Sequence, residues 1–420
     1  MASELGWIDI SPKDRNRVKR FMDLMGMSGV MDELGVGVIR DAMSNKIFPG
    51  FSTLYTRAKY FFITPYILYD IEKDVKKERA EEFHKREVKT NSLIKDYYDK
   101  NNIDESYFGK YTAGGELKRQ PSEIYWNGIT TIKLIDTESS LQQLLRTKKS
   151  DVKELLSCDC GDGITQESGE NHDSLLSRIL CYKDDWQNTI SGHGLRLAVG
   201  EADILKERFN ANIPHSLPAA LVENKELWGL YKDASEQNDK PAHAKSRFVL
   251  FVERLRNSKV EIEDQELREN LFKAHDLSLM LHGLHIAYNI KLWSSVTGCN
   301  GDFVNKLKDE GREWFKNLKN NGNSGSLIYE NFNIEDCMNG VNVKGYTREF
   351  LIEAHDVISN GSCWDCIEQK LCDLVCGQEC NNKKSKSRFE KIRKQQAIKE
   401  LQGKPEWVGL GLISYRYDAA

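Results

Sequence analysis

Apolar side chains recur every three or four positions along most of the chain, which is the spacing of one face of an α-helix. The pattern appears first in residues 11–25 and again from about Val36 to Phe48. An aromatic run follows at residues 60–69, and a stretch dense in Lys and Glu then extends to about Lys100. Such a stretch is typical of a solvated helix with ion pairs between successive turns. The pattern predicts a mainly α protein.

The second half of the chain has the same period. Residues 276–293 are apolar on almost every side, so we predict that they form a buried central helix. Helical spacing also marks residues 247–255, 303–318 and 347–358. Residues 407–417 alternate apolar and polar side chains around two glycines, and we predict a terminal strand or hairpin there.

The length of 420 residues is enough for two or three domains. Composition changes near Lys148, and residues 157–188 are cysteine-bearing, acidic and loop-like. We therefore predict a winged-helix-like N-terminal domain with a long charged helix over residues 1–150 and a cysteine-bearing insertion or linker over residues 151–200. A larger helical domain with few short strands and a basic tail would occupy residues 201–420.

The composition, with 40% hydrophobic and 30% charged residues, is that of a globular protein. No apolar run is long enough to span a bilayer, and the first residues do not resemble a signal peptide, so we expect a cytoplasmic protein without membrane contact. In that reducing compartment the ten cysteines are expected to be thiols or metal ligands. Because the net charge is −4, nucleic-acid contact would require a local basic patch.

A helix-turn-helix is the first candidate for DNA contact. The predicted helix at residues 36–48 is followed by a Pro-Gly turn and by a second helix predicted to begin at Thr53. In this motif the first residues of the second helix face base edges or phosphates. Here those residues would be Thr53, Tyr55, Arg57 and Lys59. The alternative is a pair of packed helices, since a Pro-Gly turn joins helices in many domains.

Two other segments carry basic residues. Residues 107–119 mix glycine, aromatic and basic side chains, so Lys110, Lys118 and Arg119 would form a wing beside the motif, although an ordinary surface loop is the favoured interpretation. The tail contains seven basic residues and one acid, Glu390: Lys383, Lys384, Lys386, Arg388, Lys391, Arg393 and Lys394. Such charges neutralise phosphates, with an affinity that falls steeply as salt rises. A solvated helix face is the alternative.

Cysteines gather in two places. Cys158, Cys160, His172 and Cys181 would supply four zinc ligands, but their spacing matches no common zinc motif. Cys363 and Cys366 precede Cys372, Cys376 and Cys380, and the last three recur every four residues. That period places them along one stripe of a helix, where cysteine packs as a small hydrophobe. Packing is therefore favoured over a metal or iron–sulfur site, and no cofactor is expected.

Signals for an enzyme are weak. His275, His282 and His285 share the apolar helix without a metal-binding order, so buried, hydrogen-bonded histidines are expected. A metal-dependent nuclease is the alternative, because the carboxylates of Asp203 and Glu223 with the ammonium of Lys225 would hold Mg²⁺ and activate water. Short patterns of this kind occur often by chance, so we favour a protein without catalytic residues.

Several stretches resemble an uncharacterised bacterial family, domain of unknown function 6361. Near the N-terminus they are GWIDISPKDRNRV and MDELGVGVIRDAMSNKIFPGFSTLYTRAKYFFITPYIL, and LKRQPSEIYWNGI follows. LSLMLHGLHIAYNIKLW and a tail pattern of Trp407, Gly409, Gly411 and Arg416 resemble it less specifically. Neither residues 157–188 nor residues 363–380 belong to the pattern, and we expect relatives to continue beyond Arg416.

The resemblance implies no established activity and no catalytic residues. It implies an association with multi-gene anti-phage defence clusters, beside helicase-like or phospholipase-D-like proteins. We therefore expect a non-catalytic nucleic-acid-binding or adaptor component of such a system, with DNA and other defence proteins as partners. A metal-dependent nuclease effector and a purely structural scaffold are the alternatives.

Overall fold

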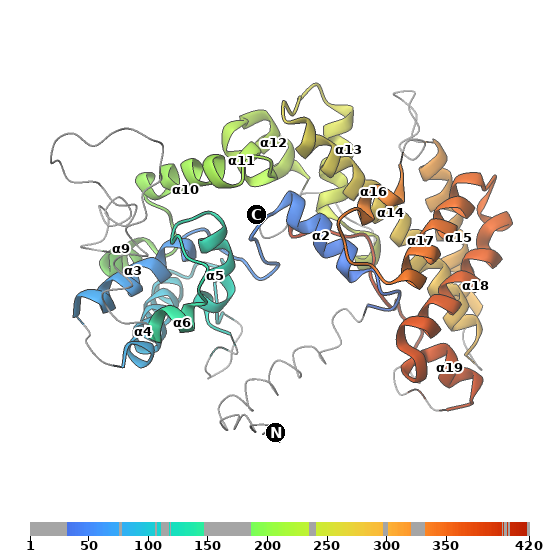
Figure 1. Ribbon diagram of the computed structural model, residues 1–420, viewed down its shortest axis with the longest axis horizontal. Helices are drawn as coiled ribbons and strands as arrows, with labels where there is room; N and C mark the ends of the chain where they lie inside the picture. Colours follow the sequence, from blue (N-terminus) through green and yellow to red (C-terminus); the bar gives the residue numbers. More distant parts are fainter. Residues whose placement is uncertain are drawn as a thin grey trace, which may run out of the picture. The chain divides into compact units, whose positions relative to one another are not determined.

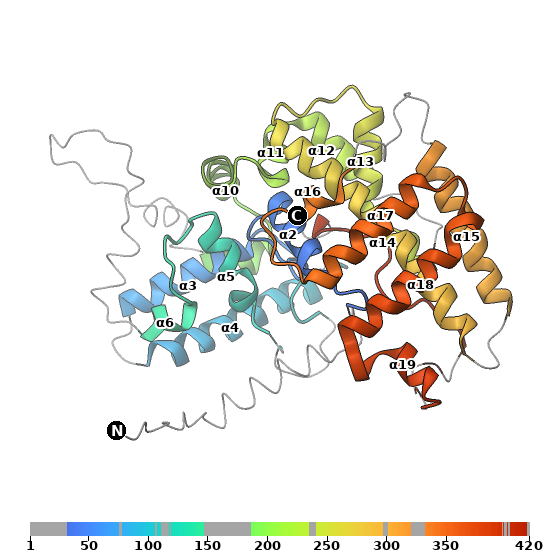
Figure 2. The ribbon, with the colours of Figure 1, turned by 45° about the vertical axis from the view of Figure 1, so that its right-hand side comes forward.

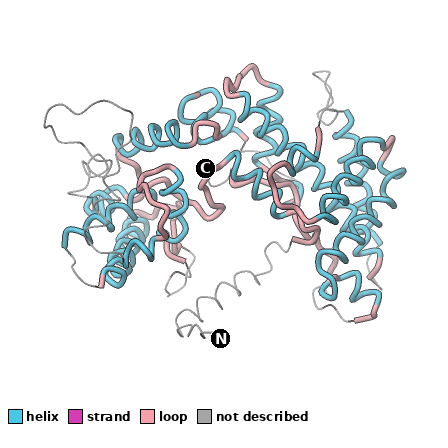
Figure 3. The backbone as a smooth tube through the Cα atoms, in the orientation of Figure 1, coloured by secondary structure: helices cyan, strands magenta, loops and turns pink. Residues whose placement is uncertain are grey.

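The computed structural model confirms a mainly α-helical protein. Figure 3 shows helices joined by loops, and the described part of the chain contains no strand. The described residues are 32–74, 78–105, 107–110, 117, 119–146, 186–234, 241–296, 301–320, 332–396, 398, 401 and 404–417. The predicted helix at residues 11–25 lies outside this set. No helix in the described ranges is long and apolar enough to cross a bilayer.

The chain divides into two compact units that interleave along the sequence. Figure 1 labels the helices of both units. The first unit draws on residues 1–36, 283–313 and 345–411, and the second on residues 37–282, 314–344 and 412–420. The boundary predicted at residue 150 falls within residues 147–185, which are not described. The predicted domain limits therefore stay predictions.

The second unit begins with helices that follow the hydrophobic pattern. They are α2 (Gly37–Ile47), α3 (Tyr60–Asp74), α4 (Arg79–Lys100), α5 (Pro121–Thr131), α6 (Leu141–Arg146) and α9 (Trp186–His193). Helix α3 packs against both α4 and α5, and Figure 2 shows these helices side by side. Helices α2 and α4 confirm the predicted amphipathic and charged helices.

Further along the second unit come α10 (Val199–Asn212), α11 (Leu217–Glu223), α12 (Lys225–Asp233), η1 (Ala242–Ala244), α13 (Arg247–Asn257) and α16 (Ile334–Met338). The long helix α14 (Gln265–Ser294) supplies residues to both units. Most of its side chains from Ala274 to Trp293 are buried, which confirms the predicted central helix.

The first unit also contains most of α15 (Gly301–Asn320), together with α17 (Gly345–Asn360), α18 (Trp364–Lys383), η2 (Lys384–Lys386) and α19 (Arg388–Arg393). Helices α17 and α18 pack along each other (Figure 2). The strand or hairpin predicted at residues 407–417 is absent, because the described tail is a loop. The tail backbone bonds to a side chain and not to another strand. The Asn289 side chain accepts a hydrogen bond from Val408 N and donates one to Val408 O, both at 2.8 Å.

The winged-helix prediction fails at its central element. Residues 51–59 form a loop with two short turns, and the helix predicted from Thr53 begins only at Tyr60. The hydroxyl of Tyr125 accepts hydrogen bonds from the backbone of Thr56 and Arg57 at 2.9 and 3.1 Å, which holds the turns against α5. This contact joins residues nearly 70 positions apart, so no local pattern predicts it.

Candidate nucleic-acid interface

The residues assigned to the recognition helix do not form a common surface. Lys59 is buried, and its ammonium lies 2.6 and 2.7 Å from the two carboxylate oxygens of Glu201. Tyr55 is buried as well and stacks on Tyr125, with ring centroids 4.0 Å apart. A side chain enclosed in the core cannot reach a phosphate. The prediction that Lys59 and Tyr55 contact DNA is therefore wrong.

The other predicted contacts near the N-terminus are scattered over several loops. Thr53 and Arg119 are exposed, whereas the guanidinium of Arg57 lies 2.7 Å from Glu105. The ammonium of Lys110 lies 2.5 Å from Asp104. Lys118 is outside the described residues. DNA contact by these five side chains stays a prediction, now without the helix that was meant to present them.

In the basic tail, two of the seven cations are internal anchors. Lys383 forms an ion pair with Glu33, and Arg388 Nη1 lies 2.7 Å from the other oxygen of the same carboxylate. Glu33 is 2% exposed and the Arg388 side chain 9% exposed. Both cations are paired with the buried Glu33, and Lys383 is only 14% exposed, which corrects the prediction that these two residues contact phosphate. They also attach the tail to the segment around Glu33 within the first unit.

A second buried carboxylate, Glu379, fixes the start of α19. Its Oε2 accepts a hydrogen bond from Ser387 Oγ at 2.6 Å, and backbone N–H groups of Arg388 and Phe389 donate to its oxygens at 3.3 Å. The hydroxyl of Tyr288 donates to Oε1 at 3.0 Å. Free N–H groups at a helix start favour a carboxylate. Glu379 thus holds α19 at one orientation.

The sequence analysis missed both anchoring acids, because their partners are distant along the chain. A local signal for the helix start was present. Ser387 followed by Glu390 is the serine–glutamate spacing of a helix N-terminus, and Ser387 Oγ accepts from Glu390 N at 3.3 Å. No comparable local signal marks Glu33, which contacts residues some 350 positions away.

The remaining cations of the tail lie on η2, on α19 or directly after it, and all but the half-buried Lys391 are exposed. We call this set the basic patch: Lys384, Lys386, Lys391, Arg393 and Lys394. Arg393 and Lys394 both contact Glu390, at 2.6 and 3.6 Å. Among the described residues, no carboxylate lies within ion-pair distance of Lys384, Lys386 or Lys391. The basic patch therefore has an excess of positive charge. The backbone of its segment is held in place by the contacts of Glu33 and Glu379.

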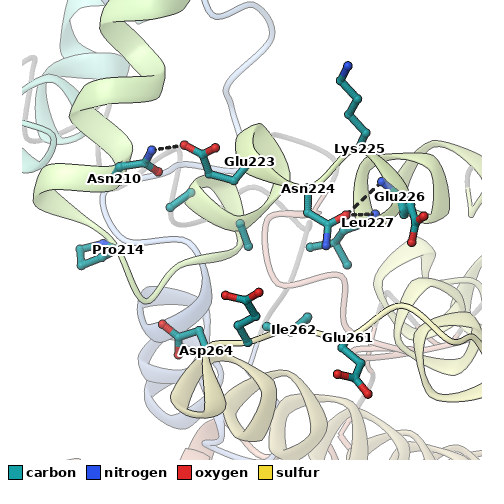
Figure 4. A pocket seen from close by; sticks show the side chains of 13 residues that line it. Asn210, Pro214, Glu223, Asn224, Lys225, Glu226, Leu227, Glu261, Ile262 and Asp264 are labelled. Atoms are coloured by element: carbon teal, nitrogen blue, oxygen red, sulfur yellow. Dashed lines mark hydrogen bonds between the residues drawn. The ribbon is translucent and has the colours of Figure 1, made fainter.

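A pocket of about 580 Å³ in the second unit contains two of the three residues of the nuclease alternative (Figure 4). Five carboxylates line it: Glu223, Glu226, Glu261, Glu263 and Asp264. Glu223 is already paired, since Lys206 lies 2.9 Å from its carboxylate and Asn210 donates to it. These partners lower the pKa of Glu223. The pocket carries negative charge and does not suit a phosphate backbone.

Asp203 does not share this pocket with Glu223 and Lys225. The side chain of Lys225 extends away from Glu223 in Figure 4, and Asp203 is exposed without lining the pocket. Within the described ranges, no group of three His, Cys, Asp or Glu side chains is placed to hold a metal ion. His275, His282 and His285 are buried, as predicted, and His275 Nδ1 lies 2.8 Å from Asp276. The geometry therefore gives the nuclease alternative no support.

The two cysteine clusters have different outcomes. Cys158, Cys160, His172 and Cys181 lie outside the described residues. In the second cluster, Cys372 is buried in α18, and its thiol donates to the Ala287 carbonyl at 3.4 Å. Burial raises the pKa of Cys372 to about 12. The packing predicted for this stripe is confirmed at Cys372, whereas Cys363 and Cys366 lie at the start of the helix and are at least partly exposed.

Comparison with known proteins identifies a family without an assigned activity. No curated protein and no solved structure matches the chain. Residues 2–229 match the Family of unknown function (DUF6361). The match covers the first half of the chain, including α2 to α5, and ends before the basic patch. The chain belongs to the Family of unknown function (DUF6361).

Proposed function

We propose that this protein is a non-catalytic, nucleic-acid-binding component that acts with other proteins of a bacterial anti-phage defence system. The basic patch on η2 and α19 carries the proposal. Four exposed cations and the half-buried Lys391 share this short segment with a single acid, Glu390. The defence role and its helicase-like or phospholipase-D-like partners rest on the family resemblance.

The anchoring below the patch favours a binding surface over a merely solvated face. Glu33 and Glu379 neutralise Lys383 and Arg388 inside the first unit, so the exposed lysines project from a segment with a defined backbone. A charge held in place loses less conformational entropy on binding than one on a flexible tail. Double-stranded DNA has a phosphate charge about every 1.7 Å of its axis, so several lysines on one short segment can be neutralised together.

The test is binding of the full-length protein to a labelled DNA duplex over a salt series. Lys384, Lys386 and Lys391 are replaced together by glutamine, because these three have no ion-pair partner among the described residues. We expect the affinity at low salt to fall at least tenfold. The slope of log affinity against log salt should decrease by about 2 to 3, since each lost phosphate contact contributes about 0.9.

A matched control carries the same charge change elsewhere. Lys85, Lys89 and Lys95 are exposed on α4, among the acids of that helix, and their replacement by glutamine should leave the slope unchanged. Equal losses of DNA affinity in the two triple variants would show that only net charge matters. That result would refute the proposal that the basic patch binds DNA. Wild-type protein that does not bind duplex or single-stranded DNA at low salt would favour the structural scaffold. Cleavage of DNA with Mg²⁺ would restore the nuclease alternative.

A further inference from the structure

Cys363 and Cys366 form a pair of thiols at the first turn of α18. Cys363 is the residue before the helix, with extended backbone angles of φ −154° and ψ 162°. The N–H of Cys366 donates to the Cys363 carbonyl at 3.3 Å, which closes the turn. Cys366 is exposed and Cys363 partly exposed, unlike the buried Cys372 on the same helix. Side chains three positions apart on a helical turn are neighbours.

The two residues between the cysteines fix this turn to α15. Trp364 is 1% exposed and packs against Gly311, where a methyl group would lie only 2.3 Å from its ring. Asp365 forms an ion pair with Arg312 at 2.8 Å. One intervening side chain is thus buried and the other is paired on the neighbouring helix. These two contacts fix the turn that carries both thiols against α15 within the first unit.

The surroundings of Cys366 favour its thiolate. The Cys363 thiol forms a hydrogen bond with it, and Ser362 Oγ donates to Cys366 Sγ at 3.6 Å. These contacts lower the pKa of Cys366. The N–H groups at the start of α18 also stabilise negative charge. By contrast, burial raises the pKa of Cys376 to about 11 and that of Cys337 to about 12.

We propose that Cys363 and Cys366 are a reversible redox pair that exchanges with a low-molecular-weight disulfide such as oxidised glutathione. The Cys366 thiolate attacks one sulfur of the reagent, which releases one glutathione thiolate and leaves a mixed disulfide. The Cys363 thiol then loses its proton and attacks Cys366 Sγ, which releases the second glutathione. The pair loses two electrons and becomes an intramolecular disulfide, and the reagent is reduced to two thiols.

The span of the turn suits such a bond. Disulfides join residues whose Cα atoms are about 4.4–6.8 Å apart, and one helical turn falls in this range. A structural zinc site is the other use of two spaced thiols, but it requires four ligands. The described residues contain no group of three metal-binding side chains that includes these cysteines. Redox exchange therefore suits the pair better.

The test uses the full-length protein in glutathione buffers of increasing oxidised fraction, followed by acid quenching, alkylation, trypsin digestion and mass spectrometry. The tryptic peptide of residues 349–370 contains Cys363 and Cys366 and no other cysteine. We expect this peptide to become two hydrogen atoms lighter and to escape alkylation. Return of both thiols on addition of dithiothreitol is also expected. A peptide that stays in the dithiol form in excess oxidised glutathione would overturn the proposal.

Two single variants assign the roles. In Cys363→Ser, the hydroxyl keeps a hydrogen-bond donor beside Cys366, and we expect iodoacetamide to modify Cys366 at pH 7 about tenfold faster than it modifies Cys363 in Cys366→Ser. Each variant should also accumulate a mixed disulfide with glutathione, faster in Cys363→Ser, because no second thiol remains to displace the bound glutathione. Equal alkylation rates in the two variants, or no mixed disulfide in either, would contradict the assigned order of attack. Cys372→Ser is the matched control and should oxidise at residues 363 and 366 as the wild type does.

Discussion

The ammonium of Lys59 is bound by both carboxylate oxygens of Glu201, 142 residues away along the chain. Tyr66 donates to the same carboxylate at 2.7 Å, and the backbone N–H of Ala198 donates at 2.8 Å. Lys59 and Glu201 are almost fully buried. The carboxylate therefore joins the start of α3 to the start of α10 inside the second unit.

Replacement of Glu201 by glutamine should destabilise the protein strongly. The amide keeps the shape of the side chain, but it leaves the Lys59 ammonium buried without a counter-charge. Loss of one partner of a buried pair costs about 3–5 kcal/mol in the free energy of unfolding. Urea denaturation followed by circular dichroism measures this change.

Glu105→Gln is the matched control, because Glu105 pairs with Arg57 at 2.7 Å on the surface. Its cost should stay below about 1 kcal/mol, as for other exposed ion pairs. Similar urea midpoints for the two variants would show that the buried pair contributes no more than a surface contact.

The carboxyl of Glu87 should make stability depend on pH. Burial raises its pKa from the ordinary 4.5 to about 7, although Ser122 donates to both of its oxygens. The folded protein then holds this proton more tightly than the unfolded chain. Ionisation of the buried carboxyl therefore lowers the free energy of unfolding. This loss of stability is absent below pH 4.5, grows as the pH rises towards 7 and reaches about 3 kcal/mol above it.

Glu87→Gln should remove this part of the pH dependence. The amide can accept from Ser122 N and donate to Ser122 Oγ, so the contacts are kept without the charge. We expect the variant to be more stable than the wild type at pH 8, by up to about 3 kcal/mol, and nearly equal to it at pH 5. Thermal unfolding at both pH values measures the difference. Glu81→Gln, at an exposed position of α4, should show no such divergence.

Replacement by alanine should change the stability of the protein in opposite directions at two helical glycines of the first unit. A methyl group at Gly311 would lie 2.3 Å from the buried ring of Trp364, so the ring or α15 must move. Such overpacking costs about 1–3 kcal/mol. At Gly377 a methyl group meets nothing within 4 Å, and alanine should stabilise α18 by up to about 1 kcal/mol. Chemical denaturation of both variants tests the pair, and a stabilising Gly311→Ala would contradict the contact with Trp364.

Helices whose hydrophobic spacing is regular were predictable from the sequence. Residues 36–48, the charged stretch to Lys100 and the apolar run at residues 276–293 all form helices close to the expected positions. Their amphipathic or apolar faces repeat over several turns, and that repetition is local information. The start of α3 was misplaced because the backbone N–H groups of Thr56 and Arg57 donate to the Tyr125 hydroxyl, which keeps both residues outside the helix.

The candidate site was predictable only in part. The concentration of lysine and arginine in the tail is visible in the sequence, and so is the short spacing between Cys363 and Cys366. Which cations face solvent is not visible there, because Lys383 and Arg388 resemble their neighbours until Glu33 is placed beside them. Likewise, Lys59 looks like a DNA-contacting residue until Glu201 encloses it.

By itself, the sequence determined the helical class, the positions of the most regular helices, the family and the places where charge and thiols concentrate. These properties depend on composition and on spacing within a few turns. Tertiary structure alone decided the exposure and pairing of each ionisable side chain. The physical reason is that burial and counter-charge come from residues far away in the chain, as Glu201 does for Lys59 and Glu33 for Arg388.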